Sequence, residues 1–189
     1  MKFSAYEEVF QEILNSPAPQ PPYDHAAYLD YAKLNWSRQQ RWLKTGVLSN
    51  EVVAAVKTIA APQQWIVITE PWCGDAAHIV PFLQMIAALN PLISIDYQLR
   101  DSPPFLINSY LTGTSKSIPK LVIRDAAGAD LAVWGPRPAG CQEVYNRLIA
   151  EKADFEQTKI ALQKWYNEDK GKSLQEELLP LLVSTVPAG

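Results

Sequence analysis

The residues best suited to chemistry stand together in the stretch Trp72-Cys73-Gly74-Asp75. This stretch follows an apolar, strand-like run at 65–69 and opens a long helical pattern at 75–89. Unsatisfied backbone N–H groups and the helix dipole favour negative charge at such a helix start. We therefore expect the pKa of the Cys73 thiol to be lowered, so that a nucleophilic thiolate forms near neutral pH. The alternative is an inert thiol that fills space in the core.

Three further residues could take part in the chemistry of Cys73. Asp75 could shuttle a proton, although an acid in the first helical turn also complements the dipole and disfavours a nearby thiolate. Arg137 lies in Gly135-Pro-Arg-Pro138 and could stabilise a thiolate or bind a carboxylate, with a surface arginine in a rigid turn as the alternative. Cys141 is a possible resolving thiol, but a disulfide needs Cα atoms within roughly 7 Å.

The elements that must position these residues follow from hydrophobic periodicity. Helices are expected at 4–14, 24–45, 50–59, 75–89 and 173–182, and across 144–166 with a break near 153–154; strands are expected at 65–69, 92–99, 121–124 and 131–134. Capping-box patterns at 4–7 and 173–176 should start the first and last helices. The strand–helix–strand order implies parallel pairing, and a turn at 125–128 implies a hairpin. The sequence thus predicts an α/β fold, a central mixed sheet flanked by helices, with extra helices at both ends.

A basic line runs along the helix expected at 24–45. Arg38, Arg41 and Lys44 stand at three-residue steps. We interpret this line as a solvated helix face, and the alternative is an anion site.

Composition limits the class of protein. The chain has 189 residues, 48 % of them hydrophobic and 20 % charged, which fits one globular domain with additions. A formal net charge of −3 and the lack of a long basic run give no reason to expect nucleic acid. Acids precede any apolar segment at the N-terminus, and no apolar run approaches the ~20 residues that span a bilayer. We expect a cytoplasmic protein without a membrane partner.

Metal and cofactor sites are not expected. His78 lies five residues after Cys73, a poor ligand spacing, and His25 is the only other histidine. The sequence holds no Gly-rich phosphate loop, nucleophile elbow or paired-carboxylate motif.

The ordered set of motifs resembles the thioredoxin superfamily. Trp72-Cys73-Gly74 matches the start of the family's Trp-Cys-Gly-Pro-Cys, Pro81 its helix-kinking proline, and Ile118-Pro119 its cis-proline loop. Gly128 and Gly135 match glycines of the terminal hairpin. The stretch Trp-Cys-Gly-Asp-Ala is similar to one in bacterial thioredoxin-like proteins. The resemblance implies an N-terminal helical extension at 1–46, a thioredoxin-like domain at 47–150 and a C-terminal helical tail at 151–189 packed on that domain.

The sequence also departs from the family's pattern. The family's second cysteine falls on Ala76, and its buried acid falls on Val67. An intramolecular dithiol cycle at this motif is therefore excluded.

The resemblance leaves three functions open. The first is a single-cysteine thiol–disulfide oxidoreductase, in which Cys73 forms a mixed disulfide with a disulfide-containing protein and a low-molecular-weight thiol resolves it. The alternative is a redox-inactive binding module that takes up a peptide or protein partner by β-addition. The third is a peroxide sensor in which Cys141 resolves a sulfenic acid on Cys73. The groove for the first two is expected at Trp72, Gly74, Ile118 and Pro119.

Overall fold

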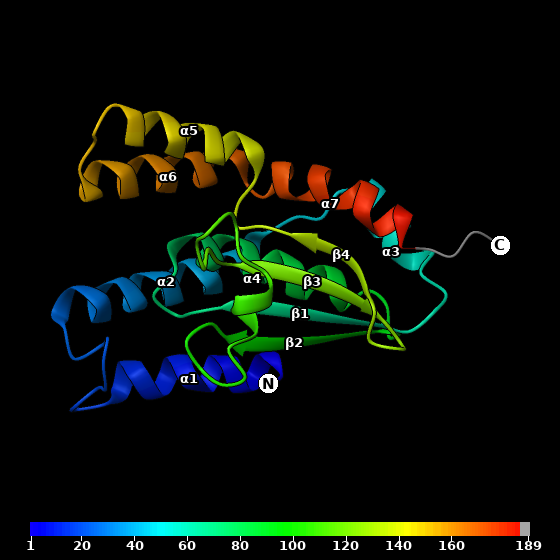
Figure 1. Cartoon of the computed structure of the whole chain (residues 1–189), viewed down its shortest axis with the longest axis horizontal. Helices are drawn as coiled ribbons and strands as arrows, with labels where there is room; N and C mark the ends of the chain where they lie inside the picture. The colour runs from blue at the N-terminus through cyan, green and yellow to red at the C-terminus, as the bar shows by residue number, and fades with distance from the viewer. Residues whose placement is uncertain (186–189) are drawn as a thin grey trace.

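A four-stranded mixed sheet forms the centre of the computed structural model, which describes residues 1–185 (Figure 1). The strands are β1 (Gln63–Thr69), β2 (Ile93–Leu99), β3 (Lys120–Asp125) and β4 (Asp130–Trp134). They lie in the order β2-β1-β3-β4. β1 pairs with β2 in parallel and with β3 antiparallel, and β3 pairs with β4 antiparallel. The predicted α/β architecture with a mixed sheet is confirmed.

Seven α-helices and one 3₁₀ turn accompany the sheet in residues 1–185. They are α1 (Phe3–Asn15), α2 (Ala26–Thr45), α3 (Asn50–Lys57), α4 (Gly74–Ala87), η1 (Leu106–Ser109), α5 (Ala139–Ala150), α6 (Phe155–Asp169) and α7 (Lys172–Ser184). α2 and α6 both pack on α4, α5 packs on α6, and α7 packs on α3. In Figure 1, α2 and the α5–α6 pair extend beyond the carboxyl end of β1, with a separation between them. No helix of the described chain is long and apolar enough to cross a membrane.

Both capping-box predictions are wrong. α1 starts after Lys2 and α7 starts after Gly171, and neither N-cap side chain makes a capping hydrogen bond. Ser173 bonds instead to the Asp169 carboxylate. The backbone at Gly171 has φ +77°, so the chain turns tightly from α6 into α7 and the helix starts before the predicted cap.

The core lies on both sides of β1. Trp65, Val67 and Ile68 of this strand are fully buried, and Leu83 and Ile86 of α4 are buried with them. β1 is the strand that carries the chain to Cys73, so the site begins at the buried end of this strand.

The first residues of the chain cover the edge of β2. The Met1 amino group donates to the Tyr97 carbonyl at 2.9 Å, and the Tyr97 N–H donates to the Met1 carbonyl at 2.7 Å. On α1, the Tyr6 ring stacks on the Tyr97 ring with centroids 5.3 Å apart. Pairing of this kind removes free backbone groups from a sheet edge.

Two loops meet at the carboxyl end of β1. Gly135 follows β4 with φ +115°, and a Cβ atom there would clash with the Pro119 carbonyl. The Ile118–Pro119 peptide bond is cis. Because Gly135 has no side chain, the end of β4 lies against the loop before β3, at the edge where Cys73 begins α4.

Candidate functional site

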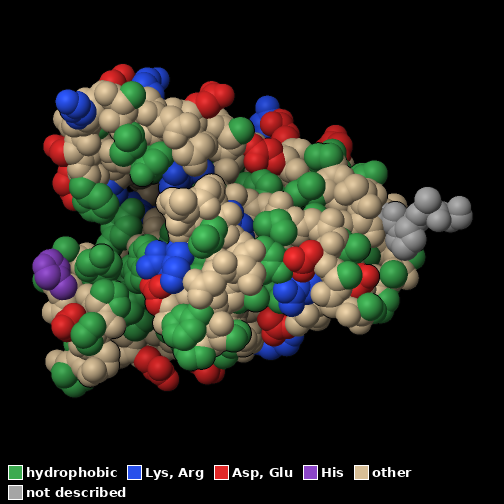
Figure 2. Space-filling view, in the orientation of Figure 1, with side chains coloured by type: hydrophobic (Ala, Val, Ile, Leu, Met, Phe, Trp, Pro, Cys, Tyr) green, Lys and Arg blue, Asp and Glu red, His purple; other side chains and the backbone are tan. Residues whose placement is uncertain are grey.

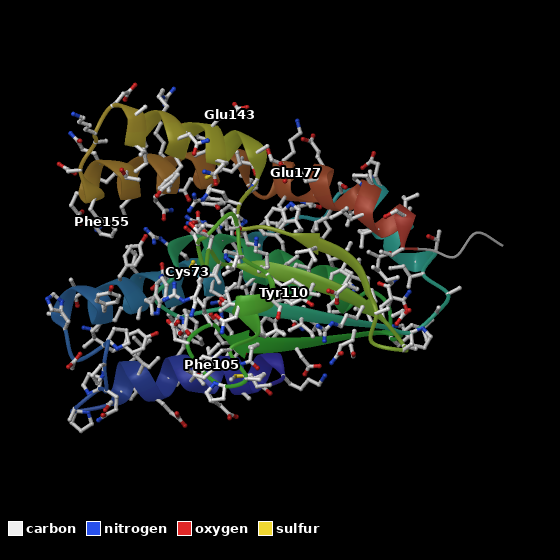
Figure 3. The ribbon with its side chains drawn as sticks, in the orientation of Figure 1. Cys73, Phe105, Tyr110, Glu143, Phe155 and Glu177 are labelled. Carbon is white, nitrogen blue, oxygen red and sulfur yellow. The ribbon has the colours of Figure 1, made fainter. Side chains whose placement is uncertain are left out.

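A cleft of about 1140 Å³ opens between α2 and the α5–α6 pair, and Cys73 lies at its base (Figure 3). Figure 2 shows the hollow, with hydrophobic side chains around its rim. Of the eight predicted catalytic, resolving and groove residues, six line it: Trp72, Cys73, Gly74, Asp75, Ile118 and Arg137. The other two, Pro119 and Cys141, do not line the cleft.

The segment that presents Cys73 is fixed by α2. The Asn35 side chain donates from Nδ2 to the Pro71 carbonyl at 3.0 Å, and Arg38 Nη1 donates to Asn35 Oδ1 at 2.9 Å. The Cys73 N–H donates to the Glu70 carbonyl at 3.0 Å, which closes the turn after β1. Cys73 is thereby held as the N-cap of α4.

The Cys73 thiol is buried and neutral. It donates to the Ile118 carbonyl at 3.4 Å and accepts from the Ala76 N–H at 3.5 Å. Burial, followed by the charge of Asp75, raises its pKa to about 12, and the Ala76 N–H and Arg137 offset only part of this rise. The expected lowering of the pKa is wrong, because loss of hydration outweighs the field of the helix start.

Asp75 and Arg137 form a buried ion pair. Arg137 donates to Asp75 Oδ2 from Nη2 at 2.5 Å and from Nε at 3.2 Å, and the Tyr166 hydroxyl donates to Asp75 Oδ1 at 2.8 Å. The two charged side chains are 10 % and 13 % exposed. Although burial acts to lower the pKa of Arg137, its pairing with Asp75 raises it. Arg137 therefore binds a carboxylate of the chain itself, and its charge offsets only part of the rise in the Cys73 pKa.

Cys141 lies close enough to the Asp75–Arg137 pair for both charges to act on its thiol. It is fully buried on α5, and both cysteines are free thiols. Burial, followed by the charge of Asp75, raises the pKa of Cys141 to about 12 as well. Neither thiol has the low pKa that favours rapid oxidation.

The sequence interpretation did not recognise that four residues of α2 form one buried or cleft-lining face of the helix. Tyr31, Asn35, Arg38 and Trp42 follow each other at steps of four, three and four, which places them on one helix face. Arg38 is 7 % exposed, so the interpretation of the basic line as a solvated face is wrong for this residue, although Arg41 and Lys44 are exposed. The helical spacing to Tyr31 and Trp42 was the signal that could have found it. Tyr166 had no such signal, because it comes from a helix 91 residues away along the chain.

His78 joins three helices. It accepts from Trp42 Nε1 at Nδ1, 2.8 Å away, and its Nε2 lies 3.0 Å from Gln163 Oε1. With Nδ1 accepting, Nε2 carries the hydrogen that is donated to Gln163. Burial lowers the pKa of His78 to about 3, which keeps the ring neutral. Within residues 1–185, no group of three or more His, Cys, Asp or Glu side chains is arranged to hold a metal ion.

Comparison with known proteins identifies the family. A family model described as Thioredoxin matches residues 22–156, so the chain belongs to the thioredoxin family. The predicted thioredoxin-like fold is thereby confirmed. A search of curated proteins found no match.

Solved structures resemble the chain at low sequence identity. An HIV epitope scaffold is 15 % identical, with a TM-score of 0.53 over 94 % of this chain and 96 % of the scaffold. A protein of unknown function from Pseudomonas aeruginosa is 16 % identical, with a TM-score of 0.48 over 78 % of this chain and 87 % of that protein. A domain of an alkyl hydroperoxide reductase from Enterococcus faecalis is 18 % identical, with a TM-score of 0.40 over 59 % of this chain and 48 % of that domain's chain. These similarities concern the fold alone.

Proposed function

We propose that this chain is a redox-inactive thioredoxin-fold binding module that takes up a peptide segment of a protein partner in the cleft above Cys73. We place it with the bacterial thioredoxin-like proteins that carry Trp-Cys-Gly-Asp-Ala, in the cytoplasm. The observation that carries the proposal is that a cleft of about 1140 Å³ has at its base a buried, protonated thiol. A thiol that stays protonated near neutral pH is a poor nucleophile.

The walls of the cleft suit an extended apolar ligand. Tyr28, Leu34, Ile149 and Phe155 line it, and all four are large hydrophobic side chains that stay exposed. Phe155 is 74 % exposed and projects from the start of α6 toward α2 (Figure 3). Exposed apolar side chains gathered around a concave surface are typical of a binding site.

The proposal is tested on the full chain with a phage-displayed peptide library. We expect selected peptides to bind the wild type and Cys73→Ser alike, because the thiol takes no part. Ser117→Trp, which adds bulk in the cleft beside Ile118, should abolish binding. Failure to select any peptide, or loss of binding in Cys73→Ser, would contradict the proposal.

A second candidate is the single-cysteine thiol–disulfide oxidoreductase. The Ala76 N–H at the thiol sulfur favours it, since a backbone donor at a helix start stabilises a thiolate. The pH dependence of iodoacetamide alkylation of Cys73 in a Cys141→Ser background separates the two. A midpoint at or above the free-thiol value of about 8.5 supports the binding module, and a midpoint well below it supports the oxidoreductase.

A further inference from the structure

The acidic side chains that line the cleft are all paired with cations, but two of the lining cations are not paired with an acid of the described chain. Each lining acid has a cationic partner on the chain: Asp30 pairs with Lys33, Asp75 with Arg137 and Glu156 with Lys159. Among the lining cations, Arg100 also has a partner, Asp101. Arg38 has none, since no carboxylate of residues 1–185 lies within 4.0 Å of its guanidinium. The exposed Lys116 in the loop before Ile118 is likewise without a carboxylate.

Arg38 differs from Lys116 because it is buried. Its guanidinium is held by Asn35 Oδ1 at 2.9 Å and lies 5.3 Å from the centroid of the Tyr31 ring. Burial lowers its pKa, but an arginine remains charged in proteins. Tyr31 partly offsets this lowering of the pKa, and the positive charge of Arg41 adds to it. A buried cation without a counter-charge is costly and gains when an anion binds beside it.

We infer that Arg38 is the anchor for a carboxylate on the peptide that the cleft binds, an inference that rests on the proposed function. The guanidinium matches a carboxylate in two parallel hydrogen bonds. The apolar body of the ligand then lies along the rim residues Tyr28, Leu34 and Phe155. Charge complementarity thus selects an apolar peptide with one carboxylate, from either a free C-terminus or an acidic side chain.

A structural role for Arg38 does not need its charge. Arg38 orients Asn35, which in turn holds the Pro71 carbonyl. A neutral donor satisfies Asn35 Oδ1 equally well, so Arg38→Gln removes the charge and keeps an amide donor. Arg38→Lys keeps the charge but loses the planar guanidinium, whose paired N–H groups can bind both oxygens of a carboxylate. Arg41→Gln is the matched control, because Arg41 is exposed on the same helix and does not line the cleft.

The test measures binding of three acetylated tetrapeptides to the full chain by calorimetry. All share the sequence Ala-Phe-Leu-Ala: one has a free C-terminal carboxylate, one is amidated, and one is amidated with its last alanine replaced by glutamate. We expect at least one of the acidic peptides to bind the wild type at least about tenfold more tightly than the neutral amide. Arg38→Gln should remove that difference, Arg38→Lys should keep part of it, and Arg41→Gln should keep all of it. The preference should also shrink as salt is added.

Each outcome bears on the inference. Tighter binding of the free acid assigns Arg38 to a peptide C-terminus, and tighter binding of the glutamate peptide assigns it to an acidic side chain. Equal binding of all three peptides, or an unchanged preference in Arg38→Gln, overturns the inference and leaves the proposed function standing. Binding of none of them overturns the inference, while the library selection decides the proposed function. If Arg38→Gln does not fold, the partial loss of the preference in Arg38→Lys, compared with its retention in Arg41→Gln, tests the inference, and an unchanged preference in Arg38→Lys overturns it.

Discussion

Asp75 is the residue on which the charges at the base of the cleft converge. Its carboxylate accepts from Arg137 and Tyr166 and is the largest charge that raises the pKa of Cys73. One side chain therefore links the stability of the site to the reactivity of its thiol. The two effects are separable by substitution.

Asp75→Asn should speed the alkylation of Cys73 and destabilise the fold. The thiol pKa falls when the negative charge is removed, and Arg137 is left buried without its partner, at a cost of about 3 kcal/mol. The measurements are the iodoacetamide rate at about pH 8.5 in a Cys141→Ser background and the free energy of unfolding in urea. Arg137→Gln is the control: it destabilises similarly but removes a cation that lowers the thiol pKa, so alkylation should slow. Equal rates in the two variants would contradict this account.

Position 74 leaves no room for a side chain, because the Tyr31 hydroxyl lies against its backbone. A Cβ atom at position 74 would overlap the Tyr31 hydroxyl. We expect Gly74→Ala to cost about 1 kcal/mol or more of unfolding free energy, despite the better helix propensity of alanine. In a Tyr31→Phe background the clashing oxygen is gone and the nearest ring carbon lies 3.2 Å away, so the same substitution should cost less. A double-mutant cycle of thermal unfolding measures the difference, and additive effects would show that the two residues do not interact.

At the scale of elements, His78 connects α4 to α2 and α6. The hydrogen bond that Nδ1 accepts from Trp42 requires a neutral ring, Nε2 donates to Gln163, and burial lowers the pKa of His78 to about 3. The packing of the helices around the cleft therefore depends on pH.

The free energy of unfolding should decrease as the pH falls from about 6.5 toward 3. In this window the unfolded chain binds a proton at residue 78 and the native chain does not, so His78 contributes a slope of about 1.4 kcal/mol per pH unit. Above about pH 6.5 the contribution is complete and constant. Urea unfolding across this pH range measures the slope, and His78→Gln should reduce it by that amount. An unchanged slope in His78→Gln would show that other groups cause the acid sensitivity.

At the scale of the whole molecule, α1 belongs to the packed core. Phe10 is 1 % exposed and its ring lies 5.5 Å from that of Trp36 on α2, while Tyr6 stacks on Tyr97 of β2. α1 thus connects the edge of the sheet to the helix that forms one wall of the cleft. The predicted boundary between an extension and a thioredoxin-like domain near residue 46 stays a prediction, and unfolding experiments can test it.

Phe10→Ala should lower the unfolding free energy of the entire chain by about 3–5 kcal/mol, because it leaves a cavity between α1 and α2. Unfolding should remain a single transition, with the same midpoint by circular dichroism and by tryptophan fluorescence. If α1 folded as a separate unit, the main transition would keep its midpoint and a small early transition would appear. That result would support the boundary near residue 46.

Much of the architecture could be read from the sequence because it depends on local periodicity. The strand at 65–69, the helix that begins after Cys73 and the hairpin turn near Asp125 each have a repeat or a turn signal within a few residues. The capping boxes failed because the same residue pattern fits more than one helix start, and the backbone turn at Gly171 selected another.

The sequence by itself determined the fold class, the lack of a second cysteine at position 76 and the placement of Cys73 at a helix start. Only the tertiary structure decided the chemistry of that position. The pKa of Cys73 depends on how completely the sulfur is removed from water, and this depends on α2, Ile118 and Asp75 together. The burial of Arg38 and the pairing of Arg137 with Asp75 are decided in the same way, since desolvation and ion pairing act between residues that are distant in the chain.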